Sequence, residues 1–514
     1  MSIYEAVGER DGRRVLSLKS PVNLQTTGEL ICANRDDVIA AVKNARDAQT
    51  GWSALSFKER AKYMDAALKV MMDQADHIMD VVVAETGKAP ADAFTMEVWA
   101  SCDALCYYAK NAAKFLAPQK RKVHGLLGFM KKVRLVYQPL GVAGIICPWN
   151  GPFILAMNQA TQALMAGNTV VIKGSEVTPN SSKLVQEIFD KAGLPAGVLT
   201  VLEGDGQTGA DLCTAGVDKI SFTGSVATGR KVAESCARQL IPCTMELGGK
   251  DAMIVCADAN LERAASGAVI GSCMNTGHYC CGTERIYVVA SVYDEFVSKV
   301  VEKTKELKQG PQHGLDEDVG AVFWDRQMTI IEAHAEDAIA KGANVLVGGK
   351  RNPDLEGLYF EPTVMTGVNN DMLIMREETF GPIICIQKVA NEEEAMQLSN
   401  DSPYGLNGNI WTKDNAKGIR MAEQMQTGAV CLNDMACTYG VPSAPFGGLK
   451  DSGVGQVNGK TGIRGYCHPK PIIIDKAGHK DKLQSGYPHT AEKIEGMKKF
   501  MRILWGSPIG RWLS

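Results

Sequence analysis

Two adjacent cysteines, Cys280 and Cys281, lie in the stretch GHYCCGTER (277–285), shortly before a run that is typical of a β-strand. A thiolate is a strong nucleophile and a metal ligand, so the pair could be a metal site, a redox pair, a nucleophile beside an uninvolved thiol, or two buried thiols without a role. Adjacent cysteines cannot easily bind one zinc ion, and the chain contains no C-x-x-C. The residues therefore weaken the first two interpretations and leave the other two open.

Two further stretches carry groups that acyl chemistry requires. MELGGK (245–250) places the carboxylate of Glu246 before two glycines. CPWNGP (147–152) places the side-chain amide of Asn150 at a predicted strand-to-helix turn. Together with Cys280 these groups would supply a nucleophile, a base and a donor for an oxyanion. Sequence order does not show that they meet in space, so the residues suggest this chemistry without establishing it.

The elements that would position these groups follow an α/β pattern from about residue 140 onward. Thr169–Lys173 is a continuous apolar run that is typical of a buried strand. Thr178 is suited to be the N-cap, and Pro179 the first residue, of a helix that ends at Gly193. Because strands and helices alternate, we predict parallel strands with right-handed crossovers. Further predicted elements are strands at 198–202 and 219–222, a helix at 227–238 and a second α/β series at about 250–445.

The segments before residue 140 and the tail of the chain do not follow this α/β pattern. Amphipathic helix patterns occupy 36–48 and 58–85, and the basic, alternating segment 121–139 predicts an exposed hairpin. The tail, 492–514, is a basic amphipathic segment with Met497, Phe500 and Trp505 among lysines and arginines. Such a segment can lie on a membrane surface, cover a substrate tunnel or pack at a subunit contact, and the sequence leaves these alternatives open.

Composition excludes several classes of protein. A length of 514 residues predicts two or three domains, and a net charge of −3 argues against a general nucleic-acid binder. The 15 cysteines are scattered and odd in number, which favours a reduced, cytoplasmic location. The N-terminus lacks the apolar region of a secretory signal, and no apolar run reaches the length of a membrane-spanning helix.

Several separated motifs give the chain a family resemblance. From about residue 20 to 475 it resembles the aldehyde dehydrogenase superfamily, of the non-acylating type that depends on NAD or NADP. The matching motifs, in the family's order, are PWNGP (148–152), VVIKGSE (170–176), FTGSVATG (222–229), MELGGK (245–250), NTGHYCCGTER (275–285), EETFGP (377–382), SPYGLNG (402–408) and PFGGLKDSG (445–453).

The resemblance implies a role for each candidate catalytic residue. Cys280 matches the nucleophile, while Cys281 falls on a variable position. The Asn150 side chain and the Cys280 backbone N–H match the oxyanion donors, and Glu246 matches the base that activates water to hydrolyse a thioester. The implied activity is oxidation of an aldehyde to a carboxylic acid.

The resemblance also implies an NAD site and no metal. Lys173 and Glu176 match residues that bind the adenosine ribose, and a carboxylate there disfavours the 2′-phosphate of NADP. Trp149 is expected near the cofactor or in the core. The remaining matches are Gly224, Ser225 and Gly229 for the pyrophosphate, and Glu378 and Phe380 for the nicotinamide side.

Two departures from the family pattern concern the reaction. His278 replaces a glutamine that is common in the family, and either tunes the thiol or has a surface or hydrogen-bonded role. Val457 stands where many relatives carry a glutamate, so Glu246 is expected to be the only base.

Substrate is predicted from residues that match the family's tunnel, which are Gly151, Leu155, Asn158, Met274 and Tyr279. Small or polar residues replace aromatics at 151 and 158, which indicates a wide tunnel. We expect a bulky hydrophobic aldehyde, aromatic or medium-to-long aliphatic. The alternatives are a semialdehyde, a thiol hydrolase, or a non-catalytic binding protein that keeps the fold.

The resemblance further implies an α/β architecture with a Rossmann-type NAD-binding domain (1–120 and 140–246) and an α/β catalytic domain (247–445). A β-hairpin oligomerisation arm (121–139 and 446–480) and a C-terminal amphipathic extension (481–514) complete it. The arm predicts a homodimer or homotetramer. The tail adds a predicted peripheral membrane contact to a cytoplasmic enzyme.

Overall fold

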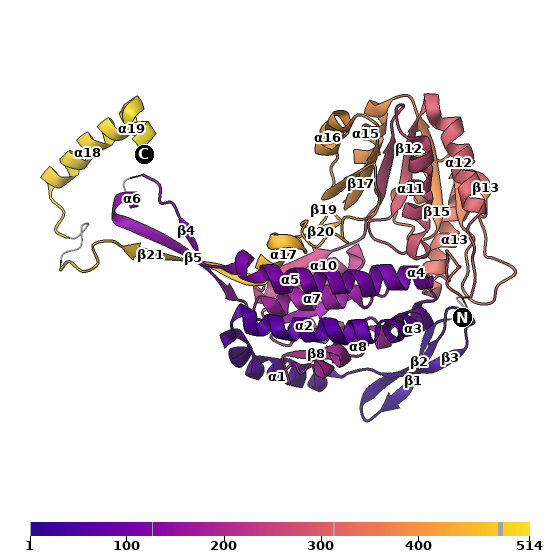
Figure 1. The fold of residues 1–514 in the computed structure, drawn as a ribbon, viewed down its shortest axis with the longest axis horizontal. Helices are drawn as coiled ribbons and strands as arrows, with labels where there is room; N and C mark the ends of the chain where they lie inside the picture. The colour runs from indigo at the N-terminus through magenta and orange to yellow at the C-terminus, as the bar shows by residue number, and fades with distance from the viewer. Residues whose placement is uncertain (1, 126, 312–313, 482–486, 514) are drawn as a thin grey trace. The chain divides into compact units, whose positions relative to one another are not determined.

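Two units make up the chain in the computed structural model, which describes residues 2–125, 127–311, 314–481 and 487–513 (Figure 1). Unit 1 comprises Met1–Ala112 and Leu140–Tyr466, and unit 2 comprises Ala113–Pro139 and Cys467–Ser514. Residues 446–466, which we expected in the arm, belong to unit 1. The reason is that β20 (Gly453–Val454) pairs with β10 (Cys243–Glu246) of that unit.

The first sheet of unit 1 has the strand order β20-β10-β9-β6-β7-β8. β6 to β10 are parallel, as predicted from the alternation of strands and helices, and β20 adds an antiparallel edge. The predicted strand at 169–173 is confirmed as β7. The strands are β6 (Val142–Ile146), β7 (Thr169–Lys173), β8 (Leu199–Leu202) and β9 (Lys219–Thr223), with β10 and β20 as above.

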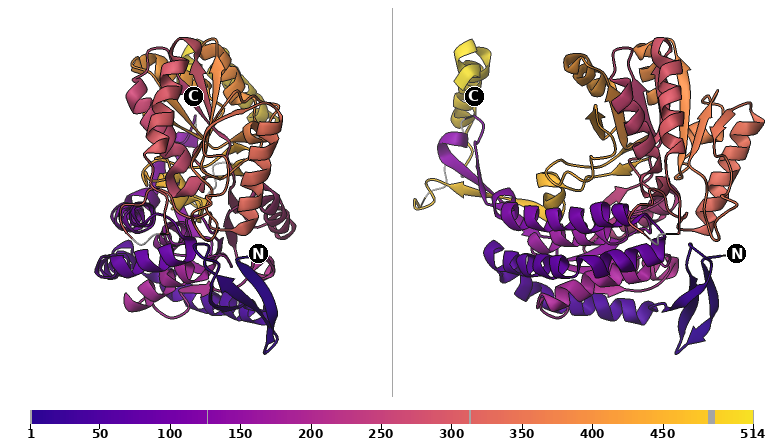
Figure 2. Two further views of the ribbon diagram at one scale, coloured as in Figure 1. Left: turned by 90° about the vertical axis from the view of Figure 1, so that its right-hand side faces the viewer. Right: turned by 45° about the vertical axis from the view of Figure 1, so that its right-hand side comes forward.

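Helices cover this sheet (Figure 2), and one group of them, α1, α9 and α10, shares a hydrophobic cluster with β6, β7 and β9. The predicted helix at 58–85 is two helices, because Gln74 departs from helical backbone angles between α2 and α3. The bounds are α1 (Arg35–Ala54), α2 (Phe57–Asp73), α3 (Ala75–Thr86), α7 (Ile154–Met165), α8 (Pro179–Lys191), α9 (Gly206–Thr214) and α10 (Val226–Gln239).

The predicted side-chain cap of α8 is wrong. Thr178 precedes Pro179 as expected, but its hydroxyl makes no cap hydrogen bond. The carboxylate of Glu85 accepts the N–H groups of Asn180 and Ser181 instead, each at 2.7 Å. A partner 95 residues away therefore satisfies the helix start, which local sequence could not reveal.

The second sheet has the order β13-β14-β15-β12-β11-β17-β18, and all strands but β13 are parallel. Both faces are apolar, since Met253 and Val255 of β11 enter one core cluster and Ala252 and Ile254 enter another. The strands are β11 (Asp251–Val255), β12 (Thr283–Val289), β13 (Asn344–Val347), β14 (Thr363–Thr366), β15 (Ile383–Val389), β17 (Asn407–Trp411) and β18 (Ala429–Leu432).

The remaining elements of unit 1 are further helices and short strands. The helices are α4 (Pro90–Asp92), η1 (Ala93–Trp99), α5 (Ala100–Leu116, which extends into unit 2), α11 (Leu261–Cys273), η2 (Met274–Gly277), η3 (Ala290–Val292), α12 (Tyr293–Lys305), α13 (Asp325–Ala340), α14 (Leu373–Arg376), α15 (Glu392–Asn400), α16 (Asn415–Gln424) and α17 (Gly459–Arg464). The strands are β1 (Tyr4–Arg10), β2 (Arg13–Lys19), β3 (Thr26–Ile31), β16 (Tyr404–Gly405) and β19 (Leu449–Lys450).

Unit 2 is a small antiparallel sheet followed by two helices. β5 (Lys131–Pro139) pairs with β4 (Gln119–Arg121) on one side and with β21 (Cys467–Asp475) on the other. The short helix α6 (Leu127–Met130) lies between β4 and β5 in the segment predicted as a hairpin. α18 (Ala491–Gly506) and α19 (Pro508–Leu513) end the chain. No helix in the described residues is long and apolar enough to cross a membrane.

Candidate active site

The candidate residues of the first half of the chain lie at one edge of the first sheet. Asn150 follows β6, Glu176 follows β7 and Ser225 follows β9, while Glu246 is the last residue of β10. The carboxyl ends of parallel strands share one edge, which is where open α/β sheets bind ligands. The fold therefore brings together residues that are up to about 100 positions apart.

The candidates of the second half precede strands of the second sheet. Cys280 precedes β12, and Glu378 and Phe380 precede β15. Only Leu247–Lys250 separates β10 from β11, so this short connection joins the two sheets. The Gly249 N–H donates to Glu378 Oε1 at 3.0 Å. Glu378 thus lies beside the loop that directly follows Glu246.

The loop that carries Cys280 is held in a strained backbone conformation. Asn275, Thr276 and Gly277 have φ values of 56°, 58° and 76°. A Cβ atom at Gly277 would lie 2.2 Å from the Gly381 backbone, so only glycine fits there. Left-handed residues other than glycine persist where the surroundings fix them, and they are frequent at functional sites.

Asn150 contacts this loop directly. Its buried side chain donates from Nδ2 to the His278 carbonyl at 3.1 Å, two residues before Cys280. Its own carbonyl accepts from Asn275 Nδ2 at 2.9 Å and from Lys88 Nζ at 3.1 Å. The predicted amide donor and the predicted nucleophile therefore lie on segments that are hydrogen-bonded to each other.

A buried ion pair that sequence reasoning missed supports Asn150. Lys88 and Glu97 are fully buried, with Nζ and Oε1 2.5 Å apart. Glu97 Oε2 also accepts the N–H groups of Phe153 at 3.2 Å and Ile154 at 2.8 Å, at the start of α7. The pair connects the Asn150 carbonyl to α7 and so fixes the turn between them.

A second buried ion pair supports the loop of Glu378 and Phe380. Lys250 Nζ contacts Glu284 Oε2, and both side chains are buried. The Glu284 carboxylate accepts the N–H groups of Thr379 at 2.8 Å and Phe380 at 2.9 Å. Lys250 and Glu284 lie within the motifs MELGGK and NTGHYCCGTER. Their place in these motifs could have pointed to them, but we assigned them no role.

Glu246 is buried and isolated from polar partners. Neither carboxyl oxygen has a hydrogen-bond partner in the described part of the chain. Burial raises the pKa of Glu246 well above its usual range, although the backbone of Val457 acts in the opposite direction. Val457 is itself buried. A carboxylate in such surroundings is unusually basic, as a general base requires.

The two thiols differ in their surroundings. Cys280 is partly exposed, whereas Cys281 is fully buried, with Sγ 3.8 Å from the Ala436 carbonyl. The hydrogen bond with the Cys281 thiol, burial, and the carboxylates of Asp251 and Glu378 raise the pKa of Cys280 well above its ordinary value. Cys280 therefore reacts as a thiolate only after losing a tightly held proton.

His278 has a hydrogen-bonded role, and the surface role that we considered is wrong, because the residue is completely buried. Its Nδ1 lies 2.7 Å from the Phe380 carbonyl, and Nε2 accepts the Phe323 N–H at 3.3 Å. Burial lowers the pKa of His278 to about 3, so the ring is neutral. Trp149 packs edge-on against His278, with ring centroids 5.0 Å apart, and lies 5.5 Å from Phe380.

The predicted cofactor residues Lys173, Glu176, Gly224, Ser225 and Gly229 lie at the carboxyl edge of the first sheet, where open sheets of this kind bind nucleotides. Lys173 Nζ and Glu176 Oε2 are 3.0 Å apart just beyond β7. Ser225 caps α10, whose first N–H groups lack intrahelical partners and so suit an anion. A Cβ atom at Gly229 would lie 2.4 Å from Leu247, so this position must stay small. The Gly224 N–H donates to the Glu246 carbonyl at 3.0 Å, which connects this edge to the candidate base.

Three of the five predicted tunnel residues lie in or against the apolar cluster around the thiols. Leu155 and Tyr279 belong to it, together with Tyr439, Phe446, Val457 and both cysteines. Asn158 donates to the Tyr439 hydroxyl at 3.1 Å and to Asn458 at 2.8 Å, so its amide is engaged in the wall. A Cβ atom at Gly151 would lie 3.4 Å from Leu155, and Met274 begins the strained turn η2.

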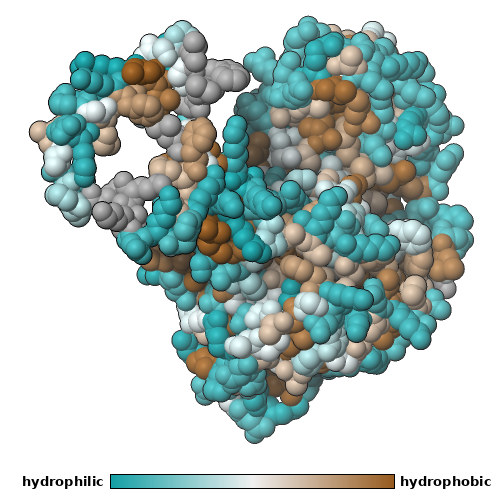
Figure 3. Space-filling view, turned by 60° about the vertical axis from the view of Figure 1, so that its left-hand side comes forward, coloured by the Kyte–Doolittle hydropathy of each residue, from teal (hydrophilic) through white to brown (hydrophobic). Residues whose placement is uncertain are grey.

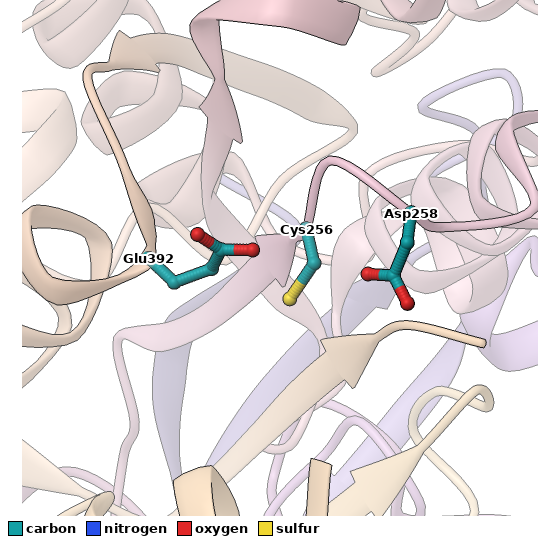
Figure 4. A group of neighbouring side chains, drawn as sticks. All are labelled: Cys256, Asp258 and Glu392. Carbon is teal, nitrogen blue, oxygen red and sulfur yellow. The ribbon is translucent and has the colours of Figure 1, made fainter. Parts of the chain in front are cut away.

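A group of potential metal ligands lies beyond the carboxyl end of β11, away from the thiols. Cys256, Asp258 and Glu392 approach one another there (Figure 4). Lys417 Nζ lies 2.7 Å from Asp258 and 3.1 Å from Glu392, so an ammonium group already balances both carboxylates. This arrangement is an ion-pair cluster between surface elements, and we assign it no metal.

Comparison with known proteins shows the family and the fold. The sequence model of the aldehyde dehydrogenase family matches residues 8–472. A putative succinate-semialdehyde dehydrogenase, NADP(+), of Mycolicibacterium smegmatis is 37% identical over 92% of this chain and 91% of its own length. A 4,4'-diapolycopene aldehyde oxidase of Methylomonas sp is 35% identical over 95% of this chain and 91% of its own. The crystal structure of a Mycobacterium tuberculosis aldehyde dehydrogenase complexed with NAD+ has a TM-score of 0.85 and 36% identity, covering 92% of this chain and 96% of that one.

Proposed function

The chain belongs to the aldehyde dehydrogenase family, and from this premise we propose that it oxidises a hydrophobic aldehyde to the acid, with NAD as the oxidant and Cys280 as the nucleophile. The observation that carries the proposal is the hydrogen bond from Asn150 to the Cys280 loop. The buried Glu246 supports it, because, besides burial, the thiol of Cys281 in this loop contributes to the raised pKa of Glu246. Nucleophile, oxyanion donor and base come from two sheets that meet at this point.

In the first step the Cys280 thiolate adds to the aldehyde carbon, and the carbonyl oxygen becomes an oxyanion. A primary amide has two N–H groups; Asn150 donates one to His278, which leaves the other for the oxyanion. Lys88 and Asn275 hold the backbone carbonyl of Asn150, and the His278 carbonyl holds its side-chain amide, so both parts of the residue are fixed before the reaction. Lys173, Glu176 and the start of α10 would hold NAD, which would supply the acceptor for the hydride that leaves this carbon as the oxyanion collapses to a thioester on Cys280.

In the second step Glu246 removes a proton from water, and the resulting hydroxide attacks the thioester carbon. The C–S bond then breaks, which releases the carboxylic acid and returns the Cys280 thiolate. The raised pKa of Glu246 suits this proton transfer. Because Val457 stands where many relatives carry a second carboxylate, we assign this role to Glu246.

For the substrate we favour a neutral hydrophobic aldehyde. The cluster against which Cys280 packs is built from apolar and aromatic side chains, including Leu155, Tyr439 and Phe446. A semialdehyde remains the second candidate, because the mycobacterial relatives are named for succinate semialdehyde. The Methylomonas relative is named instead for a diapolycopene aldehyde. Relatives of similar identity thus carry names from both substrate classes.

For the cofactor we favour NAD over NADP, because the Glu176 carboxylate lies at the strand end expected to meet the adenosine ribose. The M. smegmatis relative is named for NADP(+), whereas the M. tuberculosis structure contains NAD+. We also propose the domain roles predicted above, and assembly into a homodimer or homotetramer through the edge of β21.

The test is the rate of NADH or NADPH formation across aliphatic, aromatic, long-chain and semialdehyde substrates. Cys280→Ala serves as the inactive variant and Cys281→Ala as its matched control. Fastest turnover with neutral hydrophobic aldehydes and NAD supports the proposal. Fastest turnover with a semialdehyde would establish the second candidate, and ester hydrolysis without any reduced cofactor would contradict both.

A further inference from the structure

The charge of the protein is divided unevenly between its two units. The sequence of unit 2 holds 16 Lys and Arg against 4 Asp and Glu, a net charge of +12. The rest of the chain holds 39 against 54, a net charge of −15. The total of −3 hides this separation. A basic module on an acidic body is typical of proteins that bind an anionic partner.

Many of these cations line one hollow. It measures about 1010 Å³ and lies against β4, α6, β5 and the end of β21. Lys131 pairs with Asp475, but the neighbouring cations have no acidic partner within 4 Å among the described residues. Apolar side chains, including Phe129, share the lining. The cations are Lys120, Arg121, Lys122, Lys131, Lys132, Arg134 and Lys476.

Unit 2 also exposes large apolar side chains beside these cations. Phe129 is 75% exposed and Leu127 is 54% exposed on α6. α18 carries Lys493, Lys498, Lys499 and Arg502 against Glu492 and Glu495, and Glu495 pairs with Lys498 at 2.6 Å, so the helix keeps an excess of cations. The space-filling view shows hydrophilic and hydrophobic surface interspersed here (Figure 3). The exposed apolar residues of α18 are Ile494, Met497, Phe500, Met501, Ile503 and Trp505.

Cations alone would suit nucleic acid or a membrane, but the apolar side chains distinguish the two. A duplex offers phosphates and no hydrocarbon, whereas an anionic bilayer offers both. An amphipathic helix with Lys and Arg on its polar face and Trp, Phe and Met on the other suits the boundary between headgroups and acyl chains. α18 also lies beyond residue 472, where the match to the family model ends.

We propose that unit 2 is a docking surface for an anionic lipid bilayer. The hollow between β4 and β5 binds lipid phosphates, and Phe129 and the apolar face of α18 enter the headgroup boundary. The proposal goes beyond the enzymatic activity and does not depend on it, because binding to vesicles requires no turnover.

The test is co-sedimentation of the full-length protein with vesicles of phosphatidylcholine alone or mixed with phosphatidylglycerol. We expect binding to the mixed vesicles only, and weaker binding in high salt. Each cation near an anionic surface strengthens binding roughly fivefold, so K120Q/R121Q/K122Q is expected to weaken it roughly 100-fold. The matched control K231Q/K305Q/K413Q removes three exposed lysines of unit 1 and should bind as wild type. M497S/F500S/W505S should also release the protein.

Several results would overturn the proposal. They are equal binding to both kinds of vesicle, absence of binding to either, and equal losses in the test and control variants. Tighter salt-sensitive binding to duplex DNA than to mixed vesicles would assign the cations to nucleic acid. Light scattering measures the oligomeric state of wild type and of K120Q/R121Q/K122Q. If wild type does not bind vesicles and the oligomer dissociates in this variant, the cations of the hollow belong to a contact between copies of the chain. Unchanged turnover of a water-soluble aldehyde shows that each variant is folded.

Discussion

The candidate active site and unit 2 use charged residues in opposite ways. In the site, Lys88–Glu97 and Lys250–Glu284 are buried, and each carboxylate also accepts backbone N–H groups. In unit 2 the charges are mostly exposed, numerous and largely of one sign. Buried charges fix geometry and pKa, so one substitution should have a large local effect. Exposed charges create a field, so their effects should be small, additive and salt-sensitive.

The sharpest test of this difference is to replace each thiol in turn. Cys280→Ala removes the nucleophile and should lower turnover by at least about 10⁴-fold. Cys281→Ala removes a buried neighbour and should keep turnover within about tenfold. Neither should change vesicle binding, because both cysteines belong to unit 1. Equal loss of turnover in the two variants would mean that the nucleophile has been misassigned.

Glu246→Gln is expected to have the next largest effect. Loss of a general base lowers the rate by about 10²–10⁴-fold, and here the loss should fall on thioester hydrolysis alone. Rapid mixing should therefore still show a burst of NADH, equal in amount to the enzyme, before slow turnover. A variant that shows no burst would place Glu246 in the first step instead.

The buried pair can be compared directly with the exposed lysines. Lys88→Met leaves Glu97 charged and buried, which should lower the free energy of unfolding by about 3–5 kcal/mol. Lys88→Met/Glu97→Gln removes the uncompensated charge and should recover part of that loss. Lys122→Gln in unit 2 should change it by no more than about 0.5 kcal/mol. Chemical denaturation measures all three, and equal losses for Lys88 and Lys122 would contradict the comparison.

The same contrast explains what could be predicted from the sequence. Apolar runs such as Thr169–Lys173 predict their strands because a run of this length suits a buried strand and is too short for a typical buried helix. The motif PWNGP predicted the position of Asn150, but no motif predicted the buried pair Lys88–Glu97 that holds its backbone. A lysine such as Lys88 is normally exposed, and its burial depends on Glu97, 9 residues away, and on a carbonyl 62 residues away. The Glu85 cap of α8 was missed for the same reason.

The net charge of the whole chain hid the positive charge of unit 2. Over the whole chain the charges nearly cancel, which argues against a general nucleic-acid binder. The sequence shows that 121–139 and the tail are basic, but the structure is needed to assign Ala113–Pro139 and Cys467–Ser514 to one unit. Two segments more than 300 residues apart must be added together before the excess of cations is visible.

We expect pH to change turnover at the candidate active site and to leave vesicle binding by unit 2 unchanged. The pKa values of Cys280 and Glu246 are both raised, and both groups must lose a proton to act, so turnover should rise from neutral to alkaline pH. A carboxyl group with a raised pKa stabilises the fold below its unfolded pKa, and this contribution is lost as pH rises through the folded pKa. Stability should therefore fall over the range in which turnover rises. Vesicle binding should stay constant, because lysine and arginine remain charged below about pH 10.

The smallest expected effect belongs to Glu176, whose pair with Lys173 is intermediate between the two regions. Its side chain is 18% exposed, so water screens it more than Glu97 and less than the acids and bases of unit 2. Glu176→Gln should raise kcat/KM for NADP relative to NAD by roughly fivefold, since a partly exposed charge contributes up to about 1 kcal/mol. Glu187→Gln on α8 is the matched control and should leave the ratio unchanged. If Glu176→Gln lowered the use of both cofactors equally, the carboxylate would serve only to orient Lys173. The charge that discriminates against the 2′-phosphate would then have to lie elsewhere on this edge of the sheet.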